Sequence, residues 1–147
     1  MKDEDPVHFR LFNEIGIINQ LAQTIFEGVM PDGMTLAQFT VLNRFVRLGG
    51  SNSPAELADA FQVTRGTMTS TLQKLEAKGL VAIKADPADG RGKLVSLTAA
   101  GRSMRNTCLK RLEPELAKIA AQWPTDQVTE LLEPLTALRE QLDRMRG

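Results

Sequence analysis

The sequence of 147 residues is long enough for one domain with a hydrophobic core, or one domain with an added packing layer, but short for two independent domains. Hydrophobic residues make up 42% and charged residues 24%, which excludes a disordered, collagen-like or membrane-spanning chain. The acidic N-terminus has no apolar core behind it and is no secretory signal. We therefore expect a cytoplasmic protein with no membrane partner.

Few residues suited to metal binding or catalysis are present. The single cysteine, Cys108, cannot form an internal disulfide, and the single histidine, His8, cannot supply a histidine-based metal cage. Cationic neighbours, Arg105, Lys110 and Arg111, favour an oxidant-sensing thiol at Cys108, but a small packing residue is the commoner role. Since GxSxG, HExxH and phosphate-loop motifs are absent, we predict no catalytic site, no metal and no cofactor.

Charge is unevenly distributed although the whole chain is neutral. Residues 62–111 contain ten lysine and arginine side chains and three acidic ones, whereas the remaining residues contain eight basic and fifteen acidic side chains. A basic middle between acidic ends predicts that a polyanion would meet the middle segment first.

The first predicted helix covers Phe9–Val29, where apolar residues that include Leu11, Ile15 and Ile18 recur every three or four positions. A glycine- and proline-containing stretch, residues 28–33, is expected to end it. Thr35 followed by Gln38 has the spacing of a capping box and predicts the start of a second helix, which the glycine pair 49–50 ends.

Two short helices joined by a tight turn follow. Ser53, Pro54 and Glu56 form a strong helix start, and this helix is expected to end near Phe61. Thr64 predicts the start of the next helix, which runs to residues 78–79. Residues 80–85 and 93–97 then predict a β-hairpin with a glycine-rich tip.

Thr98 is predicted to cap a long helix that contains Pro114, and Thr125 is predicted to cap a last helix running towards Arg146. The last helix has a heptad pattern that favours contact with another chain, with packing inside one chain as the alternative. This seam consists of Val128, Leu131, Leu135, Leu138, Leu142 and Met145.

The order of elements predicts a mainly α fold with a small β-hairpin wing. Residues 35–97 have the pattern of a winged helix-turn-helix domain that binds DNA, and residues 1–34 and 98–147 are expected to be dimerisation helices. We expect the dimer contacts at Leu11, Ile15, Ile18, Leu131, Leu135, Leu138 and Leu142.

The predicted recognition helix has an apolar face, formed by Met68, Leu72 and Leu75, and an opposite face of short polar and cationic residues. Such residues can approach base edges and phosphates, whereas a merely solvated polar face is the alternative. Arginine in the first turn fits guanine, and a glutamine fits adenine. The candidate DNA-binding residues on this helix are Thr64, Arg65, Gly66, Thr67, Thr69, Ser70, Gln73 and Lys74.

Arg91 lies between two glycines at the predicted hairpin tip, from which it could extend into a minor groove or along phosphates. Asp89 is placed to support it, and Lys84 and Lys93 would flank phosphates at the hairpin base. The alternative is an ordinary turn with solvated charges.

Residues 70–101, STLQKLEAKGLVAIKADPADGRGKLVSLTAAG, closely resemble the MarR family of bacterial transcriptional regulators. The resemblance covers about residues 10–145. Its motifs comprise Leu75, Glu76 and Gly79 at the end of the recognition helix, Asp89 and Arg91 in the wing, and Leu97, Thr98 and Gly101 at the next helix start. An upstream motif comprises Thr35, Leu36, Gln38, Phe39, Val41 and Leu42.

The resemblance implies a homodimer whose first and last helices intertwine and whose two lobes bind a palindromic operator. It also implies a repressor that is released by a small molecule, such as an aromatic carboxylate bound between the first, second and fifth helices. By motif position, Thr64, Arg65, Gly66, Thr67, Thr69, Ser70 and Arg91 would face DNA. The wing departs from the family because glycines occupy positions 90 and 92, where bulkier residues are frequent.

The family's hydroperoxide-sensing and zinc-sensing branches are not expected, because their cysteine, tyrosine, histidine and acidic residues are missing here. A winged-helix module that dimerises and binds a protein partner without DNA is the alternative function.

Overall fold

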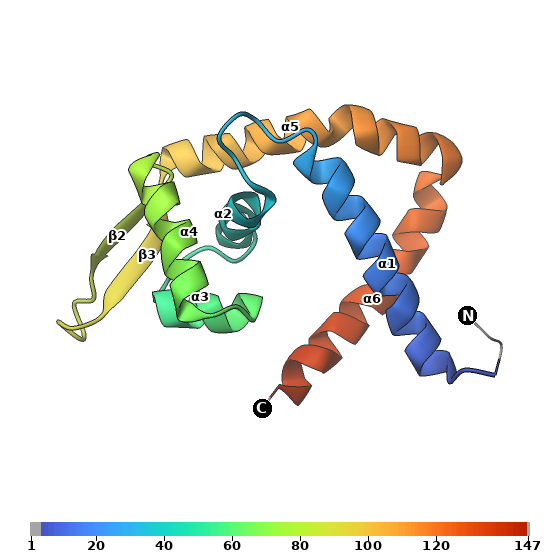
Figure 1. Ribbon diagram of the computed structural model, residues 1–147, viewed down its shortest axis with the longest axis horizontal. Helices are drawn as coiled ribbons and strands as arrows, with labels where there is room; N and C mark the ends of the chain where they lie inside the picture. Colours follow the sequence, from blue (N-terminus) through green and yellow to red (C-terminus); the bar gives the residue numbers. More distant parts are fainter. Residues whose placement is uncertain (1–3, 147) are drawn as a thin grey trace. The chain divides into compact units, whose positions relative to one another are not determined.

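The computed structural model describes residues 4–146, which form two compact units, the first ending at Leu112 and the second beginning at Glu113. The first unit contains, in chain order, α1 (Val7–Glu27), α2 (Leu36–Leu48), β1 (Ser51–Asn52), α3 (Pro54–Phe61), α4 (Arg65–Ala77), β2 (Val81–Ala85) and β3 (Lys93–Leu97) (Figure 1). Helix α5 (Ala99–Gln122) begins in the first unit and continues into the second, which also contains α6 (Thr125–Met145). The predicted fold class, mainly α with a small β wing, is confirmed.

Helices α2, α3 and α4 begin at the side chains that the sequence indicated. Thr35 and Gln38 exchange capping bonds of 3.1 and 3.4 Å, and Ser53 and Glu56 exchange bonds of 3.1 and 3.2 Å. Thr64 Oγ1 accepts from the backbone N–H of Thr67 at 3.1 Å. Each cap satisfies a backbone donor that the helix leaves unpaired, so these three starts are determined locally.

The capping box of α3 makes the stability of the protein dependent on pH. The backbone N–H of Ser53 donates to the Glu56 carboxylate and holds its pKa below the ordinary value of 4.5. This contribution to stability is present above pH 4.5 and is lost as the pH falls through the lowered pKa of the folded state. Thermal unfolding should therefore show that Glu56→Gln, which does not titrate, loses less stability than the wild type between about pH 5 and pH 3. Parallel pH profiles for the two proteins would contradict this assignment.

The sheet has three strands in the order β1-β3-β2, all antiparallel. The predicted hairpin is present, with Val81 opposite Leu97 and Ala85 opposite Lys93. Strand β1, which places Ser51 opposite Ser96, was missed, because two residues are too short for a pattern of alternation to be seen in the sequence. The wing is therefore joined to the segment between α2 and α3 as well as to its own hairpin partner.

Of the two caps predicted for the last two helices, one is confirmed and one is wrong. The Thr98 hydroxyl accepts from the N–H of Gly101 at 2.9 Å and donates to the Gly79 carbonyl at 2.7 Å, so the expected cap of α5 is confirmed. The expected Thr125 cap is wrong, because Pro124 is the N-cap residue and makes no side-chain cap bond. The fixed φ of proline suits the position before a helix, and the Pro124 carbonyl accepts the first helical bond from Val128.

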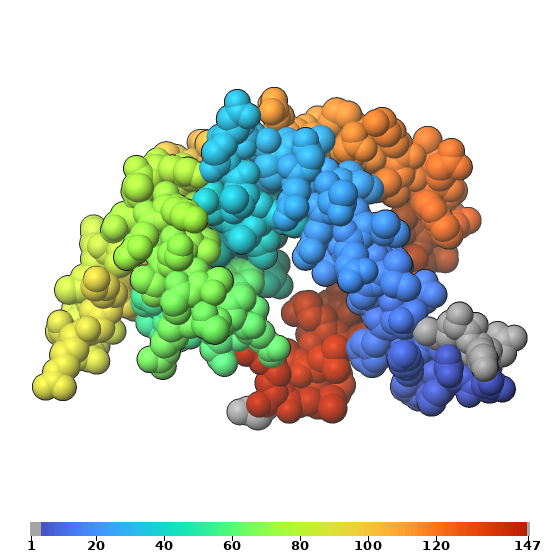
Figure 2. Space-filling model, viewed as in Figure 1, coloured from blue at the N-terminus to red at the C-terminus, as the bar shows by residue number. Residues whose placement is uncertain are grey.

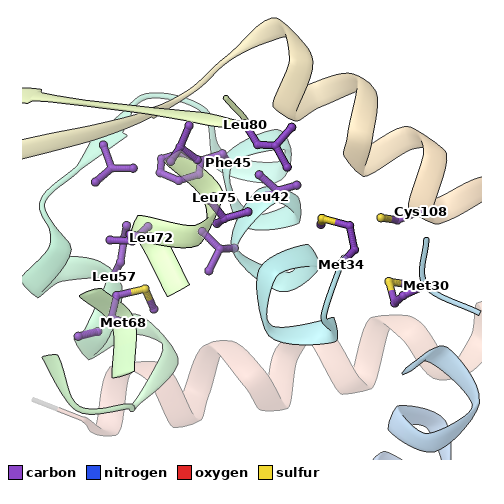
Figure 3. Close-up of a cluster of buried hydrophobic side chains, with 14 of the residues drawn as sticks. Met30, Met34, Leu42, Phe45, Leu57, Met68, Leu72, Leu75, Leu80 and Cys108 are labelled. Atoms are coloured by element: carbon purple, nitrogen blue, oxygen red, sulfur yellow. The ribbon is translucent and has the colours of Figure 1, made fainter. Parts of the chain in front are cut away.

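The core of the first unit lies between α2, the helix-turn-helix and the start of the sheet. Leu42 and Phe45 of α2 meet Leu72 and Leu75 of α4, and all four are almost completely buried (Figure 3). Since these residues occupy one face of each helix, the opposite face of α4 is left exposed. The core thus fixes which side of α4 points outward.

Helices α1 and α6 contribute no buried residue among those described. Five of the predicted dimer contacts are exposed apolar side chains. Leu131, Leu135 and Leu142 lie on α6, and Leu11 and Ile18 lie on α1. Ile15 and Leu138 are half-buried. Sequence reasoning missed Val7, Phe9, Phe12 and Leu21, which are exposed on α1 as well. Within residues 4–146, no helix combines the length and hydropathy that a membrane crossing needs.

Candidate nucleic-acid interface

The exposed face of α4 carries the side chains predicted to contact DNA. Arg65, Gly66, Thr69, Ser70 and Gln73 follow one another at the spacing of a single helical face, and all are exposed. Lys74 is also exposed, whereas the apolar stripe on the opposite side, Met68, Leu72 and Leu75, is at most 3% exposed. The side chains on the exposed face are short apart from those of Arg65, Gln73 and Lys74, so the helix backbone can approach a duplex closely.

The side-chain hydroxyls of Thr64 and Thr67 already make hydrogen bonds at the start of α4. Thr64 accepts from the Thr67 N–H and donates its hydroxyl hydrogen to Thr67 Oγ1 at 2.9 Å. The Thr67 hydroxyl can still donate outward, which is the geometry that an anionic phosphate oxygen requires. The bonds of Thr64 thus serve the start of the helix, and a contact of Thr67 with DNA stays a prediction.

The turn before α4 directs this helix into position. Gln62 ends α3 in the left-handed conformation at φ 54°, and two residues later Thr64 is the N-cap of α4. This short connection joins α3 and α4 as a helix-turn-helix, in which the second helix presents its outer face.

The wing supplies cationic residues next to α4. Arg91, Lys84 and Lys93 are exposed, and the Asp89 carboxylate accepts from the backbone N–H of Arg91 at 3.1 Å. The expected support of Arg91 by Asp89 is therefore a contact with the Arg91 backbone. Such a bond orders the loop while the guanidinium remains exposed (Figure 2 shows the hairpin tip protruding).

A groove of about 420 Å³ brings together residues from α4 and from the wing. Thr69 and Gln73 line the side of α4, and Arg91 and Lys93 line the side of the wing. Residues predicted separately, about twenty positions apart, thus share one surface.

A second groove of about 510 Å³ runs along the other side of α4. It is lined by predicted residues, including Gly66, Ser70 and Lys74, and by Thr35 and Ala37 at the start of α2. Sequence reasoning did not include Thr35 and Ala37. Only the tertiary packing of α2 against α4 places them here, although the capping box already marked the start of that helix.

The surroundings of Cys108 favour a packing role for this residue over a reactive one. Cys108 is fully buried, and burial raises the pKa of its thiol above the ordinary 9.0, so the neutral form is favoured. This supports its role as a packing residue. Among residues 4–146, no group of three histidine, cysteine or acidic side chains is placed to hold a metal ion.

Comparison with known proteins agrees with this geometry. A model described as the MarR family matches residues 32–92. The HTH-type transcriptional repressor Rv2887 of Mycobacterium tuberculosis is 30% identical over 138 residues, which is 94% of this chain and 96% of the relative. The chain belongs to the MarR family of transcriptional regulators.

Solved MarR structures share the fold over nearly the whole chain. One crystal structure of MarR is 26% identical and covers 100% of this chain and 97% of its own, with a TM-score of 0.83. A mutant of Escherichia coli MarR bound to operator DNA is 28% identical and covers 93% of this chain and 99% of its own, with a TM-score of 0.71. The predicted family and the winged-helix fold are thus confirmed.

Proposed function

We propose that this MarR-family regulator binds a palindromic operator as a homodimer, with α4 of each copy in the major groove and the wing at the adjacent backbone or minor groove. The observation that carries this proposal is the polar face of α4, from Arg65 to Lys74, which is continuous with the basic wing and opposite a fully buried stripe. This arrangement suits both base contacts and phosphate contacts. Its function is binding rather than catalysis, and we expect it in the cytoplasm.

Dimerisation is proposed to use the exposed apolar residues of the terminal segments. Residues 1–34 and 98–147 would form the dimer and residues 35–97 the DNA-binding lobe, with contacts at Leu11, Ile15, Ile18, Leu131, Leu135, Leu138 and Leu142. In support, Leu131 is 54% and Ile18 61% exposed in the single chain, an unusual state for two large apolar side chains on repeating helix faces. Two recognition helices related by a two-fold axis would read half-sites about 10 bp apart.

We further propose that the protein represses transcription and is released by a small aromatic carboxylate. The crevice expected between α1, α2 and α5 remains a prediction. The groove between α4 and the wing is lined by three cationic residues, one acidic residue and two apolar residues, namely Lys84, Arg91, Lys93, Glu76, Leu72 and Ile83, so its cations outnumber its carboxylate. A carboxylate bound there would compete directly with DNA for the same cations.

Footprinting on the DNA upstream of its own gene, with excess unrelated duplex as competitor, tests the proposed function. We expect protection of two half-sites related by a palindrome. Failure to protect any sequence, together with a salt-insensitive complex with another protein, would instead favour the interaction module.

Arg91→Ala is expected to weaken binding to operator and to unrelated duplex by a similar factor, roughly 3- to 10-fold, because its guanidinium is exposed at the wing and would contact phosphate or the minor groove. The slope of log affinity against log salt should become shallower by about one unit for each bound wing. Fluorescence anisotropy titrations at several salt concentrations measure both quantities, with Lys118→Ala on α5 as the charge control. An unchanged salt slope would remove Arg91 from the phosphate contacts.

A further inference from the structure

Lys78, at the C-terminal end of α4, connects this helix to a distant segment. Its ammonium group donates to the Gly33 carbonyl and to Gln38 Oε1, the latter at 2.8 Å, and lies 3.9 Å from Met34 Sδ. The hydrogen bonds of Thr64, Thr67 and Thr71 stay within α4, whereas those of Lys78 reach the stretch that leads into α2.

The acceptors of Lys78 are held firmly in place. Gln38 is 4% exposed, and its Oε1 also accepts from the backbone N–H of Thr35 in the capping box. Met34 is 7% exposed and packs in the core (Figure 3), and Gly33 adopts φ +80°, a conformation that favours glycine. The ammonium therefore meets acceptors that other contacts also hold.

The segment that Lys78 contacts, residues 28–35, joins α1 to α2. It is also attached to α5, because Arg111 Nε donates to the Val29 carbonyl at 3.4 Å and Met30 packs in the core. Helix α1 is a proposed dimerisation helix. The contact of Lys78 thus lies between the part that would bind the partner copy and the helix that would read DNA.

We propose that Lys78 is a positioning residue that fixes α4 relative to residues 28–35 and thereby sets the spacing of operator half-sites that the dimer accepts. This inference rests on the proposed function. The Thr98 hydroxyl already ties the C-terminal end of α4 to the start of α5, because it donates to the Gly79 carbonyl. Lys78 adds the tie to residues 28–35, and without it α4 can tilt relative to that segment. A small tilt in each copy would alter the separation of the two recognition helices.

A weaker role for Lys78 is electrostatic, since any cation near a helix C-terminus interacts favourably with the helix dipole. The two roles can be separated by variants. Lys78→Met removes the charge and the bonds. Gln38→Met keeps the ammonium but removes one of its acceptors, together with the bond that Gln38 accepts from the Thr35 N–H. Lys78→Arg retains a cation and its donors, and Lys110→Met removes an exposed ammonium from α5 as the matched control.

The experiment measures affinity for the footprinted palindrome with its natural spacing and with one base pair inserted or removed, alongside a single half-site. One base pair displaces a half-site by about 3.4 Å and rotates it by about 35°. We expect the wild type, Lys78→Arg and Lys110→Met to prefer the natural spacing by roughly tenfold or more. Lys78→Met and Gln38→Met should reduce this preference to about threefold or less, with little change on the single half-site.

Retention of the full spacing preference by Lys78→Met would overturn the inference. So would an equal loss of affinity on every duplex together with a lowered melting temperature, because that is the result of a purely structural role. A wild type that protects a palindrome but accepts all spacings equally would overturn the inference and leave the proposed function standing. A wild type that binds every duplex alike would overturn both.

Discussion

Arg65→Ala is expected to lower the affinity for the operator by about 10- to 100-fold for each recognition helix and to relax the preference at one base pair in each half-site. Arg65 is the first residue of α4, it is exposed, and the Thr64 cap fixes the helix start beside it. An arginine there can donate two parallel bonds to guanine O6 and N7, a pairing worth roughly 1–3 kcal/mol. Affinities for a set of operators with single base-pair changes measure the effect.

Two further variants show whether the effect of Arg65→Ala comes from the paired donors of arginine or from its charge alone. Arg65→Lys keeps the charge but loses the planar pair of donors, so we expect the base preference to fall more than the overall affinity. Arg102→Ala removes an exposed arginine from α5 and should leave the preference unchanged. If Arg65→Ala lowers the affinity for all DNA sequences equally, Arg65 contacts phosphate and reads no base.

Gly101→Ala is expected to destabilise the protein by at least about 3 kcal/mol and to lower its melting temperature by roughly 10 °C or more. A Cβ atom at position 101 would fall on the Leu80 carbonyl oxygen and lie 2.6 Å from Leu97 Cδ1. These neighbours are backbone and a strand residue, and the α5 cap at Thr98 holds the helix against them, so relief requires separating α5 from the wing. Thermal and denaturant unfolding measure the loss.

The control for Gly101→Ala is Gly66→Ala on α4, where a Cβ would meet nothing within 4 Å. That change should leave stability unaltered or raise it by about 0.5–1 kcal/mol, because alanine is the better helix former. Equal stability of the two variants would mean that α5 does not pack on Leu80 as described.

Local signals explain how much of the fold could be predicted from the sequence. The caps at Thr35, Ser53, Thr64 and Thr98 each need only a side chain and a backbone group three residues away, so their spacing is visible in the sequence. The buried stripe of α4 is equally visible, since helical periodicity determines it. The same logic failed at Thr125, because the preceding Pro124 competes for the position before the helix.

Features formed by distant residues were not predictable. Strand β1 exists only because Ser51 and Asn52 meet β3, and the contact of Lys78 with Gly33 joins residues 45 positions apart. Likewise, the polar residues of α4 were predicted correctly as exposed, but the two grooves beside them depend on how α2 and the wing pack. A pattern in one segment carries no information about such neighbours.

The most direct test of the central claim is the ratio of affinities for the palindromic operator and a scrambled duplex of equal length, measured at two salt concentrations. We predict that the operator binds at least about a thousandfold more tightly, as one dimer for each palindrome, and that both affinities fall steeply with salt. A ratio near one at both salt concentrations would contradict sequence-specific binding and leave only a basic surface.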